Sequence, residues 1–324
     1  MTRWSWIGVG VVLLAVACGD DDGSTDAGGR EDVRTGVDAP ALDVGEGVDA
    51  FVEDTGSTED AGTDAGPIGS PGCVDGAGLD EGEHTFTLEG NDRRYILRLP
   101  NGYSRDRTWP LVLALHGNGG NTGYWDGTSG GRNIRGVLED DAVLIVAEAI
   151  DNQWRDYDMD RETWDPRIES ELLYFDQIIE EAKNELCIDE DAIFSMGFSG
   201  GGSFSGVLGC RRTDIRAIAV GGSVIYFAEG RDLDDPDLCV GTPAAWITIG
   251  TEELAAGREA YRDFFRDRAG CDATSSPTDP DPPCVAYDGC DAATPVTYCQ
   301  HPDGHIWPDF ASDAMWAFFS QFVD

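Results

Sequence analysis

The sequence predicts an α/β fold in which a doubly wound, mostly parallel sheet forms a single domain behind a disordered tether. Three features support this: uninterrupted apolar runs, helical patterns between several of them, and a polar segment at residues 18–72 that precedes them. Strands buried on both faces of a parallel sheet read as continuous apolar runs. Such runs occur at 111–115, 143–147, 193–196, 215–220 and 244–249. Alternating strands and helices then indicate helices on both faces of the sheet.

Further elements complete the predicted domain. Residues 85–88 and 95–99 alternate between apolar and polar side chains, which is typical of edge or hairpin strands. The clearest helix covers 171–186, because apolar side chains recur on one face at Leu172, Phe175, Ile178, Ile179, Ala182 and Leu186. A last strand is expected at 295–299. Residues 73–324 therefore fit one α/β domain.

The amino terminus, residues 1–17, reads as a secretory signal. One arginine precedes an apolar run of about 14 residues, which is too short to span a bilayer well and ends in small residues. Residues 14–18, Leu-Ala-Val-Ala-Cys, resemble a relaxed bacterial lipobox and predict lipidation of Cys18. Because the chain has nine Cys, this would leave eight that can pair in an oxidising compartment. The alternative is cleavage after Ala17, giving a secreted protein with one spare thiol.

Residues 18–72 form an acidic linker with 15 acidic residues and two arginines, a net charge of −13. With almost no aromatic side chains, this segment cannot bury enough apolar surface to fold, and we expect it to be disordered. The whole chain carries 22 Lys and Arg against 62 Asp and Glu, a net charge of −40. That charge argues against nucleic acid and against any membrane contact other than an amino-terminal lipid anchor. We expect an exported monomer, either an outer-membrane lipoprotein or an extracellular protein.

The motif Gly-x-Ser-x-Gly occurs at 127–131 and at 197–201. For such a motif to hold a nucleophile, a strand must end at the serine and a helix must begin after it. Ser199 follows the predicted strand 193–196 and precedes a Gly-rich helical stretch, whereas Ser129 follows no strand. We therefore predict that Ser199 is a nucleophile and that Ser129 is a loop residue.

A second Gly-rich segment, His-Gly-Asn-Gly-Gly at 116–120, follows the strand 111–115. Backbone N–H groups in such a loop can point at a negative charge that develops during a reaction. The backbone amides of Asn118 and Gly200 are the expected oxyanion donors. His116, in the same segment, is expected to support the loop rather than to act as a base.

The base must come from four histidines, of which His301 and His305 follow the last predicted strand. His305 is preferred to His301, and the alternative is that both are structural loop residues. Pro302 and Gly304 interrupt any helix here, so the two histidines do not form a helical metal-binding pair, and we expect no metal or other cofactor.

The acidic partner of the base is expected after the strand 244–249, where Gly-Thr-Glu-Glu follows at 250–253. A carboxylate there would orient the imidazole and stabilise its charged form. Glu253 is the first choice and Glu252 the second. If both are surface acids, the candidates become Asp272 and Asp303.

Several phrases occur in the order found in one group of enzymes. They are Arg-Leu-Pro-Asn-Gly-Tyr at 98–103, Trp-Pro-Leu-Val-Leu-Ala-Leu-His-Gly at 109–117, Phe-Ser-Met-Gly-Phe-Ser-Gly-Gly at 194–201 and Gly-His-Ile-Trp-Pro at 304–308. Through them, residues from about 84 to 324 resemble secreted α/β-hydrolase esterases of the feruloyl esterase, acetylxylan esterase and polyhydroxybutyrate depolymerase group.

The resemblance implies an α/β-hydrolase fold and a serine esterase in which Ser199 and His305 act with the amides of Asn118 and Gly200. Where this group usually shows Gly-Thr-x-Asp, the chain has Gly-Thr-Glu-Glu, so Glu253 takes the place of the Asp. We expect a feruloyl-esterase-like enzyme that acts on neutral plant-polysaccharide or similar esters. The alternatives are a polyhydroxybutyrate depolymerase-like esterase, a peptidase of related fold and a catalytically silent binding lipoprotein.

Two further expectations concern the surroundings of the site. Trp154, Tyr157 and Trp164 follow the strand 143–147, on the side where α/β sheets bind ligands, and Trp154 and Trp164 are the predicted substrate-binding residues. Core packing is the alternative for each. Four of the eight later Cys crowd into 271–299, and disulfides are expected to staple this segment, although the sequence does not choose their pairing.

Overall fold

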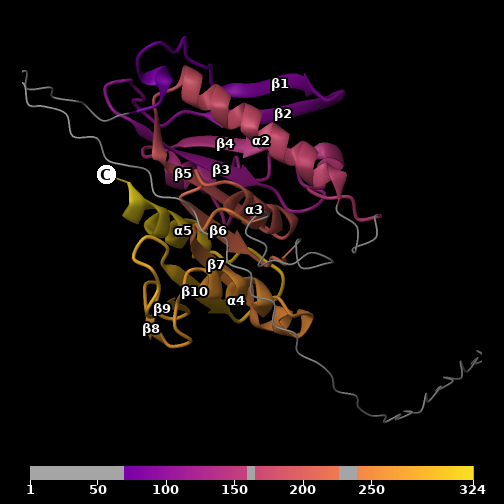
Figure 1. The fold of residues 1–324 in the computed structure, drawn as a ribbon, viewed down its shortest axis with the longest axis vertical. Helices are drawn as coiled ribbons and strands as arrows, with labels where there is room; N and C mark the ends of the chain where they lie inside the picture. Colours follow the sequence, from indigo (N-terminus) through magenta and orange to yellow (C-terminus); the bar gives the residue numbers. More distant parts are fainter. Residues whose placement is uncertain (1–68, 159–164, 226–238, 324) are drawn as a thin grey trace, which may run out of the picture. The chain divides into compact units, whose positions relative to one another are not determined.

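The computed structural model describes residues 69–158, 165–225 and 239–323 (Figure 1). The predicted signal peptide, the lipidation site Cys18, nearly all of the linker and Trp164 lie outside these ranges. None of the helices in these ranges combines the length and the apolar composition of a membrane-spanning segment.

The described residues contain a single sheet of ten strands in the order β1-β2-β4-β3-β5-β6-β7-β10-β9-β8. Its six central strands are parallel: β4 (Val143–Ala147), β3 (Trp109–Leu115), β5 (Ile188–Phe198), β6 (Ala217–Gly221), β7 (Ala244–Gly250) and β10 (Val296–His301). Antiparallel strands form the two edges: β1 (Gly82–Leu88) with β2 (Asn91–Arg98), and β9 (Cys284–Tyr287) with β8 (Ser275–Pro277). The predicted mostly parallel α/β sheet is confirmed.

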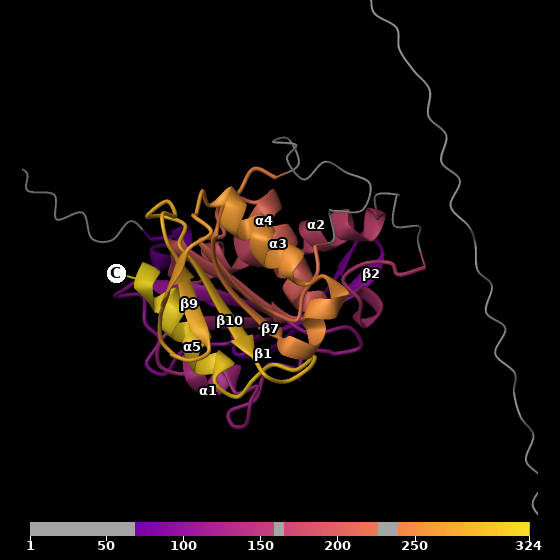
Figure 2. The ribbon, with the colours of Figure 1, turned by 90° about the horizontal axis from the view of Figure 1, so that it is seen from below.

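Helices cover both faces of the sheet. One face carries α2 (Pro166–Glu185), α3 (Gly200–Arg211) and α4 (Glu259–Arg268), and the other carries α1 (Ile134–Leu138) and α5 (Ala311–Phe319). Figure 2 shows the sheet between these two groups. Short 3-10 helices occur at η1 (Pro71–Cys73), η2 (Ile150–Asn152), η3 (Thr251–Ala256) and η4 (Ser320–Phe322).

Two apolar cores, one on each face, explain the uninterrupted apolar runs of the central strands. In β3, Leu111, Leu113 and Leu115 point into the core beneath α2 and α3, while Val112 and Ala114 point into the core beneath α1 and α5. Successive side chains of a strand point to opposite faces, so a strand covered on both sides must be apolar at every position.

The long helix α2 begins five residues before the predicted start at 171. Asp165 caps it, because its side chain accepts a hydrogen bond from the backbone N–H of Arg167 at 2.9 Å. Pro166 occupies the first helical position, where its fixed backbone angle suits a helix and its missing N–H leaves no bond unmade.

The folded domain also begins before the predicted linker boundary at 72. Ser70 is buried, and its hydroxyl donates to the carbonyl of Leu186 at 2.8 Å. Its backbone N–H donates to the carbonyl of Ile188 at 3.0 Å. Residues 69–72 are therefore packed against the start of β5 and are not part of a disordered linker.

Four disulfides pair all eight of the later cysteines: Cys73–Cys187, Cys210–Cys239, Cys271–Cys290 and Cys284–Cys299. The last two staple the segment 271–299, as predicted, and one of them joins β9 to β10. Complete pairing is typical of proteins that fold in an oxidising compartment outside the cytoplasm.

The Cys73–Cys187 disulfide is expected to make a large contribution to stability, because it closes a loop with a sequence separation of 114 residues. Cross-linking so long a loop restricts the unfolded chain and is worth about 4 kcal/mol. Replacing both cysteines with serine should lower the free energy of unfolding by roughly that amount, measured by urea denaturation. The turn at Ser199 should keep its structure at 25 °C, because the bridge lies before β5 and Ser199 follows the other end of that strand. An unchanged free energy of unfolding in the double-serine variant would contradict this account.

Candidate active site

Ser199 lies on a tight turn between β5 and α3. Its backbone has φ 57° and ψ −121°, a strained conformation for a residue with a side chain. The turn is held by a hydrogen bond from the N–H of Ser199 to the carbonyl of Gly221 at 2.8 Å. A side chain at Gly201 would come within 2.2 Å of the carbonyl oxygen of Leu115, so the glycine is needed for α3 to approach β3. The motif thus presents the serine hydroxyl at the carboxyl end of the sheet.

Three predicted residues from separate loops meet at this turn. The Nε2 atom of His305 lies 2.9 Å from the Oγ of Ser199, and its Nδ1 lies 2.5 Å from Oε1 of Glu253. The carboxylate can only accept, so Nδ1 donates to it and Nε2 is left to accept from the hydroxyl. Because β7 and β10 are parallel neighbours, the loops that follow them bring Glu253 and His305 together.

Glu253 is held by more than the imidazole. Its Oε2 accepts from the N–H of Gly250 at 3.2 Å, and Arg258 Nε lies 2.6 Å from Oε1. Burial opposes ionisation of this carboxyl, but the His305 hydrogen bond, the Arg258 charge and the Gly250 N–H together hold its pKa below the usual value. Glu253 is therefore an ionised, anchored carboxylate, and the turn of η3 accommodates its extra methylene.

The other carboxylates considered from the sequence are not at this position. Glu252, one residue away, is exposed, as are Asp272 and Asp303. The second histidine candidate, His301, is buried at the end of β10, and its pKa is lowered by that burial despite Asp303 at 3.8 Å. Of these candidates, His305 is within hydrogen-bond distance of Ser199, and Glu253 is within hydrogen-bond distance of His305.

The predicted oxyanion residues lie beside each other. Gly200 is the first residue of α3, and a side chain there would come within 2.1 Å of Asn118 Oδ1. Asn118 belongs to the loop after β3, which His116 supports. The imidazole of His116 is fully buried, donates from Nδ1 to the Gly117 carbonyl and accepts at Nε2 from the Ala149 N–H. Its burial lowers its pKa, so it is a neutral structural residue, as expected.

The structure corrects the prediction that Trp154 binds substrate. Its indole is 0% exposed, packs against the rings of His116, Phe175 and Phe204, and donates from Nε1 to the His116 carbonyl at 2.7 Å. Trp154 therefore holds the Asn118 loop from inside the core and offers no surface to a ligand. Trp164, the other predicted residue, lies outside the described residues.

Exposed apolar side chains nevertheless flank the site. Tyr157, 44% exposed, accepts at its hydroxyl from Asn118 Nδ2 at 2.6 Å. Ile306 directly follows His305, and the N–H of Val224 donates to the Ser203 hydroxyl in the first turn of α3. Both Ile306 and Val224 are exposed. Neither Val224 nor Ile306 could be singled out from the sequence, because the two loops that carry them come together only in the folded chain.

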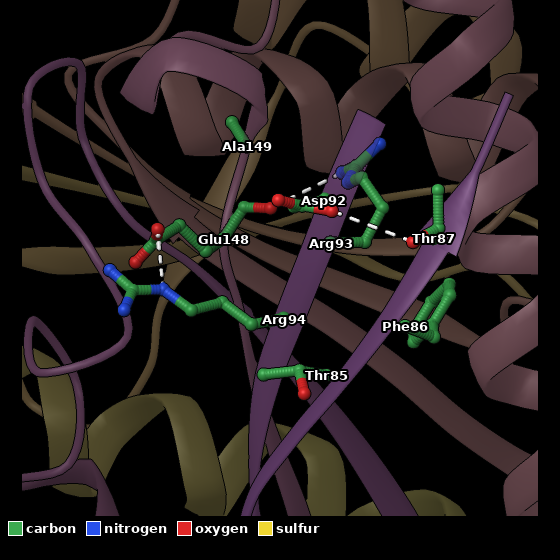
Figure 3. A pocket seen from close by; sticks show the side chains of 8 residues that line it. All are labelled: Thr85, Phe86, Thr87, Asp92, Arg93, Arg94, Glu148 and Ala149. Atoms are coloured by element: carbon green, nitrogen blue, oxygen red, sulfur yellow. Dashed lines mark hydrogen bonds and ion pairs between the residues drawn. The ribbon is translucent and has the colours of Figure 1, made fainter. Parts of the chain in front are cut away.

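The pocket of Figure 3 is separate from these residues. It has a volume of about 650 Å³ and is lined by residues of β1, β2 and the end of β4. Its charged side chains already have partners: Arg94 pairs with Glu148 at 2.7 Å and Arg93 with Glu171 at 2.5 Å. Neither Ser199 nor His305 lines it, and we assign it no role. Among the described residues, no cluster of side chains is suited to hold a metal ion.

Gly222 offers a test of how closely the imidazole is confined. It has φ 58°, and a side chain there would come within 2.7 Å of His305 Nδ1. Gly222→Ala should therefore displace the imidazole and lower kcat for any reaction that uses the Ser199 hydroxyl by about a hundredfold. The matched control is Gly102→Ala, because Gly102 has φ 72° but no atom near the added methyl. Thermal unfolding should show the cost of a positive φ in both variants and a further loss in Gly222→Ala from the clash. Equal activity in two folded variants would contradict the account.

The known proteins that are similar to this chain include feruloyl esterases, although no protein-family profile matches the chain. Feruloyl esterase D of Neurospora crassa is 27% identical over 283 residues, covering 78% of this chain and 90% of that protein. Feruloyl esterase C of Emericella nidulans is 26% identical over 263 residues, covering 77% and 90%.

Solved structures with the same fold include the acetyl xylan esterase from Aspergillus awamori, with a TM-score of 0.55, 13% identity and coverage of 73% of this chain and 99% of that one. A ferulic acid esterase gives a TM-score of 0.51, 14% identity and coverage of 75% and 98%. The fold is therefore that of the α/β-hydrolases. With its relatives, this makes the protein a carboxylic ester hydrolase similar to feruloyl esterases.

Proposed function

We propose that the protein hydrolyses neutral esters of aromatic acids of the feruloyl type, with Ser199 as nucleophile, His305 as base and Glu253 as the acid that orients the base. The observation that carries this proposal is the continuous chain of hydrogen-bond contacts from the Ser199 hydroxyl through both nitrogens of His305 to Glu253. The names of the sequence relatives supply the acyl class.

The proposed reaction proceeds in two halves. The Ser199 Oγ attacks the ester carbonyl carbon while its proton passes to His305 Nε2, and Glu253 stabilises the imidazolium. The backbone amides of Asn118 and Gly200 stabilise the negative carbonyl oxygen. His305 then gives its proton to the leaving alcohol. In the second half, water donates a proton to His305 as it attacks the acyl-enzyme, which releases the acid and restores Ser199.

The surroundings of Ser199 support a neutral, partly apolar substrate. Tyr157, Val224 and Ile306 expose apolar surface from three loops around the site. An aromatic acyl group can stack on a tyrosine ring and bury such surface. Residues 73–324 carry 47 acidic residues and 19 cations, a net charge of −28, which opposes the approach of a polyanion.

The proposed cellular setting is an exported enzyme. Four disulfides favour folding outside the cytoplasm. We propose that residues 1–17 are removed as a signal peptide, that Cys18 carries lipid and that the acidic segment behind it acts as a tether. The mass of the amino-terminal peptide from the membrane fraction tests this, since an unmodified Cys18 would contradict the anchor.

A substrate panel tests the proposed activity. The exported protein should hydrolyse methyl ferulate with a higher kcat/KM than acetylated xylan or a short polyhydroxybutyrate. Activity confined to the polyester would instead identify a polyhydroxybutyrate depolymerase-like enzyme. Cleavage of amide substrates alone would identify a peptidase. Binding without hydrolysis of any of them would identify a catalytically silent protein.

A further inference from the structure

Arg258 contacts both segments that enclose the imidazole of His305. Its Nε lies 2.6 Å from Glu253 Oε1, and its Nη1 donates to the carbonyl of Gly222. Gly222 lies directly against His305 Nδ1, as the clash of an added methyl shows. The guanidinium is 20% exposed and the carboxylate 5%, so solvent screens this charge pair only in part. Arg258 thus ties η3 to the turn after β6, with His305 between them.

The stability of α4 does not explain a cation at this place. Arg258 is the cap residue at the amino end of α4, and its side chain makes no capping hydrogen bond. The amino end of a helix carries partial positive charge, so a cation there is unfavourable. Arg262 and Arg266, further along α4, pair with acids of that helix: Glu259, Asp263 and Asp267. Arg258 instead pairs with Glu253, outside the helix.

Arg258 and His305 interact with the Glu253 carboxylate in different ways: the arginine through its charge, and the imidazole through a directed hydrogen bond. Although Arg258 Nε is close to Oε1 of Glu253, its N–H is not directed at that oxygen as a hydrogen bond requires. The directed hydrogen bond to Oε1 comes from His305. The arginine therefore supplies charge and restricts the carboxylate, and leaves the hydrogen bond to the imidazole.

We propose that Arg258 is a positioning residue of the catalytic site, which fixes the Glu253 carboxylate against His305 and partly offsets its negative charge. This inference rests on the proposed triad. An anchored carboxylate alone favours a protonated imidazole, and a protonated imidazole cannot accept the Ser199 proton. The positive charge of Arg258, 2.6 Å from Oε1, offsets part of the attraction that the carboxylate exerts on the His305 proton.

Several other groups face the imidazole of His305 besides Arg258. Glu253 and Ser199 face the ring directly, and the uncharged ring of Phe198 packs on it at 4.6 Å. From the β10 side come buried His301 and exposed Asp303, and from η3 comes exposed Glu252 beside Gly304. All of these residues are present in every variant at position 258, so differences between the variants report on the arginine and on the Glu253 carboxylate that it holds.

The test compares the pH profiles of kcat/KM for methyl ferulate in three variants. Arg258→Met keeps the length of the side chain and removes its charge, so the acidic limb should move upward by about one pH unit. Its kcat on the alkaline plateau should fall about tenfold with little change in KM, because the carboxylate is less well oriented. Arg258→Lys keeps the charge, so its acidic limb should stay close to that of the wild type.

The matched control is Arg266→Met, because Arg266 is on the same helix and equally exposed at 20%, but its ion pairs are with acids of α4 and its guanidinium lies over the ring of Tyr287. Its profile should superimpose on that of the wild type. Thermal unfolding of each variant separates loss of fold from loss of orientation. An unmoved acidic limb in a folded Arg258→Met protein, or an equal shift in the control, would overturn the inference. A wild-type protein that hydrolyses no ester would instead overturn the proposed function.

Discussion

Ser199→Ala is expected to lower kcat/KM for methyl ferulate by about 10⁵-fold. Without the Oγ atom no acyl-enzyme forms, and only the oxyanion amides and substrate binding remain to assist direct attack by water. The fold should not change, because alanine tolerates the same backbone as serine and the turn is held by the backbone bond to Gly221. Steady-state kinetics with far-ultraviolet circular dichroism measures both effects.

The second Gly-x-Ser-x-Gly motif supplies the control for this experiment. Ser129 is exposed in a loop before α1, with no strand leading into it. Ser129→Ala should keep the wild-type kcat/KM within about twofold, as surface substitutions away from a site usually do. If Ser199→Ala retained substantial activity, or if Ser129→Ala lost it, the nucleophile would be wrongly assigned.

Glu253→Gln is expected to lower kcat by about 10³ to 10⁴-fold. The amide preserves the size of the side chain but removes the charge that stabilises the imidazolium and fixes the proton on Nδ1. Because the ground-state site keeps its shape, KM should change little. Comparison of kcat and KM for the variant and the wild type checks this expectation.

The matched control for Glu253→Gln is the same Glu-to-Gln replacement at the neighbouring residue, Glu252. Glu252 is exposed, and the Nδ1–H of His305 already donates to Glu253, so Glu252→Gln should leave kcat nearly unchanged. The reverse result, with Glu252→Gln inactive and Glu253→Gln active, would move the acidic role to the second choice made from the sequence.

The sheet and the nucleophile turn were predictable because each imposes a local pattern. A strand covered on both faces, such as β3, must be apolar throughout, and this is visible in one sequence. The turn at Ser199 needs a glycine two residues before and two residues after the serine, since a side chain at Gly197 would meet the backbone of Gly201 and one at Gly201 would meet the carbonyl of Leu115. Such requirements leave short, recognisable motifs.

The choice of the acid depended on tertiary structure. In a chain with 62 acidic residues, Glu252 and Glu253 cannot be told apart from the sequence. In the 3-10 helix η3, neighbouring side chains point in different directions, so Glu252 is exposed and Glu253 faces His305. The helices α1, α4 and α5 and the hairpin of β8 and β9 were not predicted either. They are short, and α4 is rich in charged side chains, so their apolar patterns are weak.

Trp154 shows a different limit of sequence-based prediction. A tryptophan after the carboxyl end of a parallel strand can face a ligand or turn back into the core. Here the chain turns back, because the indole N–H reaches the His116 carbonyl and the ring fills the space between Phe175 and Phe204. Arg258 was not singled out at all, and its one signal in the sequence is a cation at the start of a helix in a strongly acidic chain.

The most direct test of the proposed catalytic site is covalent labelling with an organophosphonate that reacts with activated serines. Mass spectrometry of the intact protein should show one adduct per chain, and peptide mapping should locate it on Ser199. Ester hydrolysis should fall in proportion to the labelled fraction, and both should be prevented by excess methyl ferulate. An adduct on another serine, or continued hydrolysis by fully labelled protein, would contradict the assignment of Ser199, His305 and Glu253 as the catalytic triad.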